Sequence, residues 1–136
     1  FLEGGEAALA VASGMFAELT AVLTLAQAGD RIVAADTLYG GSFQLFKQSL
    51  PRMGIECDFV DAADPDALSR AIGPKTRAAF IETPSNPTMK VVDVAACAEV
   101  CSAPKDSPVR WPEREMDEAR PASGKTPCLS PQCVSL

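Results

Sequence analysis

The chain has 136 residues, of which 47% are apolar, enough to form the core of one folded domain. Its formal net charge of −6 offers no basic surface for a phosphate backbone, so we expect no nucleic acid partner. The apolar stretches end well before the ~20 residues that cross a bilayer, and no basic segment precedes an apolar run at the N-terminus, so we expect a cytoplasmic protein without membrane contact.

Two segments of different character meet near Ser102. Residues 1–101 carry 7 basic and 13 acidic side chains, whereas residues 102–136 carry 5 of each and 6 of the 11 prolines. These prolines leave no room for a normal helix or central strand, so we predict a folded domain over 1–101 and an irregular, proline-rich tail over 102–136. A first residue that is not Met suggests that the chain is a fragment. The abrupt change near Ser102 suggests a shifted reading frame or a misjoined gene end. A natural partner-binding tail is the alternative.

Short strands alternate with helices along residues 1–101. A helix over 15–26 follows Ser13 and ends before Gly29, and its nearly continuous apolar surface predicts burial on most sides. The further predicted elements are strands over 31–35, 56–60 and 78–81, and helices over 42–49 (ended by Pro51), 65–72 (capped by Asp64) and 93–101. This order predicts an α/β fold with a parallel sheet, right-handed crossovers and helices on its faces.

The cysteines are odd in number, five, and the chain has no secretory signal, so a disulfide framework has little support. Cys97 and Cys101 are four residues apart on one predicted helical face, a spacing that metal ligands also use. The chain contains no His to complete such a site. We therefore expect small buried thiols and no metal.

The first candidate site is Ser13-Gly14-Met15, at the start of the first predicted helix. Ser13 can cap the helix, and the backbone amides of Gly14 and Met15 then point out of its positive end. Such a helix start suits a phosphate group, and glycine lets a ligand approach the backbone. A plain helix cap is the alternative interpretation.

The second candidate is Tyr39, the only tyrosine, in the loop that follows the first predicted strand. Ligands of parallel sheets bind outside the carboxyl ends of the strands, where this ring can lie against a planar ligand. Its hydroxyl can take part in proton transfer. A partly buried loop aromatic is the alternative.

The third candidate is Asn86, between Pro84 and Pro87 in the loop that leaves the third predicted strand. Two prolines stiffen this loop and hold the Asn86 amide, both a donor and an acceptor, in one direction. A simple rigid turn is the alternative.

Taken together and in this order, these clusters resemble the Cys/Met-metabolism enzymes that use pyridoxal 5′-phosphate (PLP). The phrases that carry the resemblance are Leu2-Glu3-Gly4-Gly5, Ala12-Ser13-Gly14-Met15, Ala28-Gly29-Asp30, Leu38-Tyr39-Gly40-Gly41, Leu50-Pro51-Arg52-Met53-Gly54-Ile55, Phe59-Val60-Asp61 and Glu82-Thr83-Pro84-Ser85-Asn86-Pro87.

The resemblance implies part of a fold-type I PLP-transferase large domain over residues 1–101. It further implies that Ser13, Gly14 and Met15 hold the cofactor phosphate and that Tyr39 stacks on the pyridine ring and acts near the leaving group. Asn86 would lie by the ring hydroxyl and the substrate carboxylate. The implied partners are a small amino-acid substrate and further copies in a homo-oligomer.

The implied reaction is γ-replacement, in which sulfide replaces the acyloxy group of an O-acylhomoserine, as in the sulfhydrylases of methionine biosynthesis. Elimination by a cystathionine or methionine γ-lyase is the alternative, and a non-catalytic truncated subunit is a third possibility. The family's Schiff-base lysine follows a Ser-x-Thr pattern that none of the five lysines of this chain matches. We therefore expect the chain alone to be inactive.

Overall fold

The computed structural model describes residues 8–102, and the predicted tail lies almost wholly outside them. Their elements are α1 (Gly14–Leu25), β1 (Arg31–Ala35), α2 (Gly40–Gln44), the π-helical turn η1 (Leu45–Ser49), α3 (Leu50–Arg52), β2 (Glu56–Val60), α4 (Pro65–Ala71), β3 (Thr76–Phe80) and α5 (Val94–Ser102). No helix among the described residues has the length and apolar character needed to cross a membrane.

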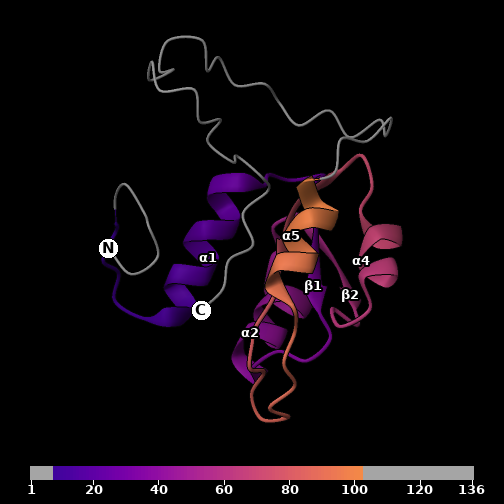
Figure 1. The fold of residues 1–136 in the computed structure, drawn as a ribbon. Coiled ribbons are helices and arrows are strands. Elements are labelled where there is room, and N and C mark those ends of the chain that lie inside the picture. Colours follow the sequence, from indigo (N-terminus) through magenta and orange to yellow (C-terminus); the bar gives the residue numbers. More distant parts are fainter. Residues whose placement is uncertain (1–7, 103–136) are drawn as a thin grey trace, which may run out of the picture.

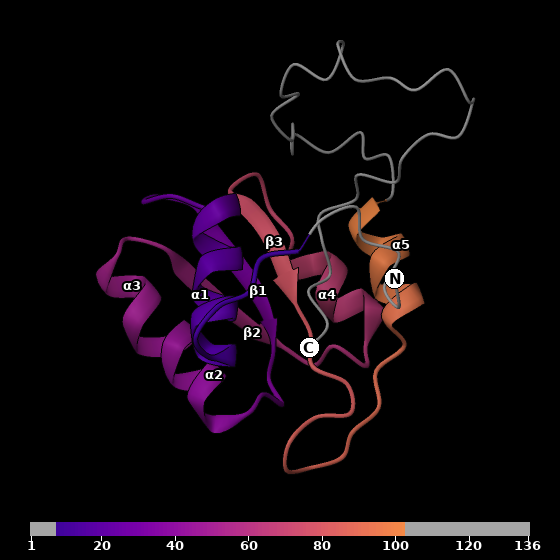
Figure 2. The same ribbon diagram turned by 90° about the vertical axis from the view of Figure 1, so that its left-hand side faces the viewer.

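The described strands form a parallel sheet in the order β2-β1-β3, which confirms the predicted α/β architecture. Helices cover both of its faces, with α1 to α3 on one side and α4 and α5 on the other (Figures 1 and 2). Arg31 pairs with Glu56 and with Thr76, so the three strands begin at one edge of the sheet and end together at the opposite, carboxyl edge.

The core lies between the sheet and its two helical layers. The central strand β1 is buried at four of its five positions, because a middle strand has helices on both faces and a neighbour on each side. Phe46, on η1, is fully buried and its ring lies 4.7 Å from that of Phe80 on β3. Cys97 and Cys101, on α5, are buried in the core, and Cys97 Sγ donates to Ala62 O, after β2, at 3.4 Å.

The second helical segment differs from the prediction. A helix over 42–49 was expected to end before Pro51, but the helical path runs without a break from Gly40 to Arg52 through the π-helical turn. The Leu50 amide bonds to Leu45 O, and Pro51 then falls in the first turn of α3. A proline lacks an N–H, which is not needed at that position, so it does not end the helix here.

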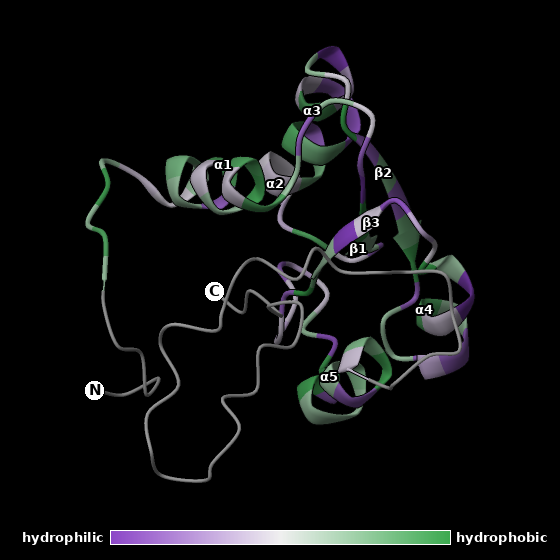
Figure 3. Ribbon diagram, turned by 90° about the horizontal axis from the view of Figure 1, so that it is seen from above, coloured by the Kyte–Doolittle hydropathy of each residue, from purple (hydrophilic) through white to green (hydrophobic). Residues whose placement is uncertain are grey.

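The predicted burial of the first helix on most sides is also wrong. Only Glu18 and Val22 of α1 are buried, and Phe16 and Leu23 remain 52% and 46% exposed. Green, hydrophobic stretches of α1 therefore lie on the outside in Figure 3. Within residues 8–102, α1 flanks the sheet and packs only one stripe of its surface against it.

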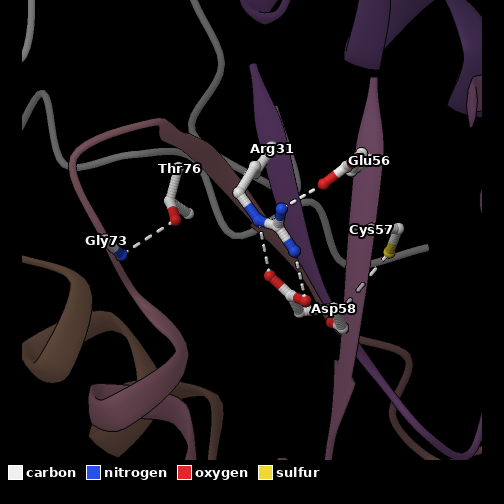
Figure 4. A network of polar contacts seen from close by, with 6 residues as sticks. All are labelled: Arg31, Glu56, Cys57, Asp58, Gly73 and Thr76. Atoms are coloured by element: carbon white, nitrogen blue, oxygen red, sulfur yellow. Dashed lines mark hydrogen bonds and ion pairs between the residues drawn. The ribbon is translucent and has the colours of Figure 1, made fainter. Parts of the chain in front are cut away.

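An ionic network ties the amino edge of the sheet together (Figure 4). Arg31 Nε and Nη2 donate to the two carboxylate oxygens of Asp58 at 2.9 and 2.6 Å, and Nη1 binds Glu56. Burial, helped by the charge of Asp58, raises the pKa of the neighbouring Cys57 thiol to about 12. Cys57 is therefore almost entirely an unreactive thiol at neutral pH.

Candidate functional site

The start of α1 has the geometry of a phosphate site. Ser13 caps the helix: its Oγ accepts the Phe16 amide at 3.2 Å, and its carbonyl accepts the Ala17 amide at 3.0 Å. Among residues 8–102, the amides of Gly14 and Met15 have no acceptor. A Cβ on Gly14 would meet no atom within 4 Å, so no described side chain crowds the helix start at the Gly14 Cβ position.

This donor set fits the phosphate of PLP. Two unpaired amides lie at the positive end of a 12-residue helix, where anions are favoured. The Ser13 hydroxyl uses its oxygen as acceptor for the helix, and its proton remains available to a further acceptor.

The Tyr39 side chain lies near the start of α1. A Cβ on Gly41 would lie 2.6 Å from Tyr39 Cε1 and 3.0 Å from Met15 Sδ, so the ring edge and the Met15 side chain both border Gly41. The Tyr39 side chain is 50% exposed, and its hydroxyl makes no hydrogen bond with any described residue. One face of a planar ligand can therefore reach the ring without displacing protein contacts.

Asn86 lies on a loop that is fixed by its own hydrogen bonds. Ser85 is fully buried, and its Oγ contacts Thr88 Oγ1 at 2.6 Å and accepts the Lys90 amide at 3.1 Å. The loop ends are joined because the Val92 amide donates to Thr83 Oγ1 at 3.0 Å. Asn86 itself is exposed, so its side-chain amide is accessible on a loop whose backbone is fixed.

The same loop is anchored to β2 by an ion pair at the carboxyl edge. Lys90 Nζ lies 2.5 Å from Asp61 Oδ1, which follows β2 directly. The pair lowers the pKa of Asp61 and raises that of Lys90. Lys90 therefore stays a protonated ammonium group near neutral pH, and in this form it is a poor nucleophile.

Glu82 connects the two loops. Its Oε2 accepts the Tyr39 amide at 2.7 Å, and its Oε1 accepts the Asn86 amide at 3.1 Å. Glu82 opens the motif that ends at Pro87, but the sequence alone indicated no role for it. Its signal was a carboxylate two residues after a buried strand, at the edge where ligands bind.

Glu18 is a second carboxylate that sequence reasoning missed. It is 5% exposed and accepts the Ser42 hydroxyl at 2.8 Å, while its Oε2 has no partner among the described residues. Burial raises the pKa of Glu18 most, the Ser42 hydrogen bond opposes the shift, and the negative charge of Glu82 adds to it. Glu18 follows Gly14 by one helical turn, so a protonated Glu18 would leave the helix start free of a competing negative charge.

We expect Glu18→Gln to reduce the pH dependence of stability. The folded-state pKa of Glu18 lies above its unfolded value, so the native state holds the proton more tightly and stability falls as pH rises through that interval. Urea unfolding of the wild type and the variant at acidic and neutral pH should show that the variant gains stability relative to the wild type as pH rises. The matched change Glu99→Gln, at an exposed position, should leave the wild-type slope unaltered. Equal slopes in wild type and Glu18→Gln would contradict the assignment.

The described surface also has a hollow of about 360 Å³ at the other end of α1. Asp30 and Arg77 line it, and they form an ion pair of 2.9 Å. It lies at the amino edge of the sheet, away from Tyr39 and Asn86, so it is not part of the candidate site.

A family model described as Cys/Met metabolism PLP-dependent enzyme matches residues 1–109. The chain belongs to this family. The O-acetyl-L-homoserine sulfhydrylase of Leptospira meyeri is 46% identical over 99 residues, which are 73% of this chain and 22% of that protein. The cystathionine gamma-lyase of Bacillus subtilis is 43% identical over 99 residues, 73% of this chain and 26% of the relative. The chain thus spans about a quarter of the length of the curated relatives it matches.

Solved structures show the same fold. The O-acetylhomoserine sulfhydrylase of Wolinella succinogenes is 46% identical with a TM-score of 0.64, over 65% of this chain and 26% of that one. A Campylobacter jejuni protein assigned as an O-acetylhomoserine (thiol)-lyase is 35% identical with a TM-score of 0.65, over 67% of this chain and 23% of that one, and contains N′-pyridoxyl-lysine-5′-monophosphate. The described residues are therefore part of a fold-type I PLP domain.

The structure brings the sequence-predicted residues to one edge. Met15 and Tyr39 border the same glycine, and Tyr39 and Asn86 share the carboxylate of Glu82. Ser13 and Gly14 lie at the adjoining helix start. Their roles toward a cofactor remain predictions.

Proposed function

We propose that residues 8–102 supply one part of a PLP site in a sulfur amino-acid enzyme. The observation that carries this proposal is the pair of unpaired amides at Gly14 and Met15, with open space at the Gly14 Cβ position, beside the Tyr39 ring. In this proposal the two amides bind the phosphate, and Ser13 both caps the helix and offers its hydroxyl proton.

The remaining roles follow from the chemistry of the side chains. PLP, when bound, supplies an electron sink for carbanions formed on the substrate. The Tyr39 ring supports one face of the pyridine ring, and its hydroxyl moves a proton at the group that leaves the substrate. The Asn86 side-chain amide can donate to the ring hydroxyl or to the substrate carboxylate.

For the whole protein we propose γ-replacement, in which the Cγ–O bond of an O-acylhomoserine breaks, the acyloxy group leaves as a carboxylate, and sulfide forms a new bond to Cγ. Similarity to the Leptospira meyeri and Wolinella succinogenes sulfhydrylases, both 46% identical, supports this reaction. The 43% identity to the Bacillus subtilis cystathionine gamma-lyase keeps γ-elimination as the alternative. A small amino-acid substrate and a homo-oligomer belong to the same proposal.

The test is binding of 4′-deoxypyridoxine 5′-phosphate, which keeps the ring and phosphate but has no aldehyde to react with lysines. We expect Gly14→Val to weaken binding about tenfold to a hundredfold, because a side chain there blocks hydrogen bonds to a charged phosphate. Gly73→Val is the matched control: a Cβ at Gly73 also meets no atom within 4 Å, and Gly73 lies in the turn before β3, at the amino edge of the sheet.

Equilibrium dialysis of the wild type and both variants measures the effect. Equal affinities for wild type and Gly14→Val would remove the phosphate site at α1. Failure of the wild-type chain to bind the analogue at all would count against the proposed function of the described residues.

A further inference from the structure

The carboxylate of Glu82 joins two loops that are far apart in the sequence. Tyr39 follows β1 and is 43 residues from Glu82, whereas Asn86 lies four residues beyond it. Each carboxylate oxygen accepts one backbone amide, at 2.7 Å for Tyr39 and 3.1 Å for Asn86. Among residues 8–102, Glu82 is the one side chain that hydrogen-bonds to both loops.

The two loops differ in how they are held. The Asn86 loop is already fixed by the buried Ser85 and by the bonds between Thr83 and Val92. The Tyr39 backbone precedes α2, and its amide has the Glu82 carboxylate as its acceptor. Through Glu82, the backbone at Tyr39 is therefore hydrogen-bonded to the fixed Asn86 loop.

We propose that Glu82 is a positioning residue that sets the distance between Tyr39 and Asn86 through their backbone amides. The effect of this clamp on ligand binding rests on the proposed function, because it assumes that both side chains contact one cofactor. Hydrogen bonds from neutral amides to a carboxylate are stronger than those between neutral groups, which suits such a clamp. Both bonds go to the backbone, so in this proposal Glu82 acts through its neighbours.

Glu82→Gln tests the clamp with little change of shape. The glutamine keeps one acceptor oxygen but replaces the other with NH₂, which cannot accept a backbone amide. Hydrogen exchange of the full chain should show at least about tenfold faster exchange at the Tyr39 or the Asn86 amide. The Ser85 amide is the internal control: it bonds to Lys90 O at 3.0 Å and should keep its protection.

The second readout is affinity for 4′-deoxypyridoxine 5′-phosphate, which should fall about tenfold in Glu82→Gln. Glu99→Gln, which removes an exposed carboxylate from α5, should change neither exchange nor affinity. Unchanged exchange at both amides would overturn the clamp. Faster exchange with unchanged affinity would overturn its role in positioning the two side chains, even though the phosphate site at Gly14 would stand.

A measurement on the wild-type chain covers the case in which Glu82→Gln does not fold. In the wild-type chain, the Tyr39 and Asn86 amides should both be protected from hydrogen exchange, because the Glu82 carboxylate accepts both. Exchange at either amide as fast as that of an unprotected amide would overturn the clamp. Protection of both amides in a wild-type chain that binds no analogue would keep the clamp, and overturn the proposed function together with the cofactor role of Glu82.

Discussion

Replacement of Phe46 by alanine is expected to lower the free energy of unfolding by about 3–5 kcal/mol. Phe46 is fully buried, and its ring packs on Phe80, so the change leaves a cavity between the helical segment and β3. A domain of this size is stable by about 5–15 kcal/mol, so this single change removes a large part of the total.

Urea unfolding followed by circular dichroism measures this loss. Phe43→Ala is the matched control, because Phe43 is half-buried at 4.8 Å from Phe59, with Lys47 Nζ 5.0 Å from its ring centroid. Its loss should be about half that of Phe46→Ala or less, since less area leaves water. If Phe46→Ala does not fold, Phe46→Leu should still cost roughly 1–2 kcal/mol. A Phe46→Ala variant as stable as the wild type would show that this contact is not part of the core.

The sheet could be predicted where local signals and tertiary packing agree. β1 and β2 occupy the predicted residues. Short runs with β-branched or aromatic residues between turn residues favour strands over helices. Helix α4 begins at Pro65 with Asp64 Oδ1 accepting the Asp66 amide, as its capping sequence indicates. β3 begins two residues before the prediction, at Thr76 and Arg77, which are polar and did not fit an apolar strand.

The structure explains why those two polar residues belong to the strand. Thr76 is buried and its hydroxyl accepts the Gly73 amide at 3.0 Å, while Arg77 pairs with Asp30 at 2.9 Å. The contacts with Gly73 and Asp30 form only in the folded chain, so local sequence patterns do not predict them. The same reasoning applies to α1, whose apolar composition predicts burial but does not tell which part of the surface the described residues cover.

The candidate site shows a similar division. The sequence indicated Ser13, Gly14, Met15, Tyr39 and Asn86 because each lies at a helix start or after a strand end. It could not reveal the residues that hold them in place, since Glu18 meets Ser42 across 24 positions and Glu82 meets Tyr39 across 43. Residues that carry chemistry follow local patterns, whereas their supports depend on how distant segments pack.

The second large effect is expected from Tyr39→Phe, tested in a complete enzyme. Residues 8–102 can replace the matching segment of the Leptospira meyeri sulfhydrylase, which is 46% identical to this chain over 99 residues. Turnover of O-acetylhomoserine and sulfide by the chimaera should fall on the order of a hundredfold in Tyr39→Phe, because the hydroxyl that moves a proton is lost. Affinity for PLP should change far less, because the ring remains.

The surroundings of Tyr39 allow the effect of its hydroxyl to be separated from that of its ring. The Tyr39 ring is half-exposed, its carbons Cε1 and Cδ1 border Gly41, and its hydroxyl binds no described residue. Loss of the hydroxyl should therefore not disturb the fold. Tyr39→Leu removes the flat ring as well, and should weaken PLP binding in addition to turnover. If Tyr39→Phe kept nearly normal turnover while Tyr39→Leu lost PLP affinity, Tyr39 would serve only to stack on the cofactor, and the proton would have to move through another group.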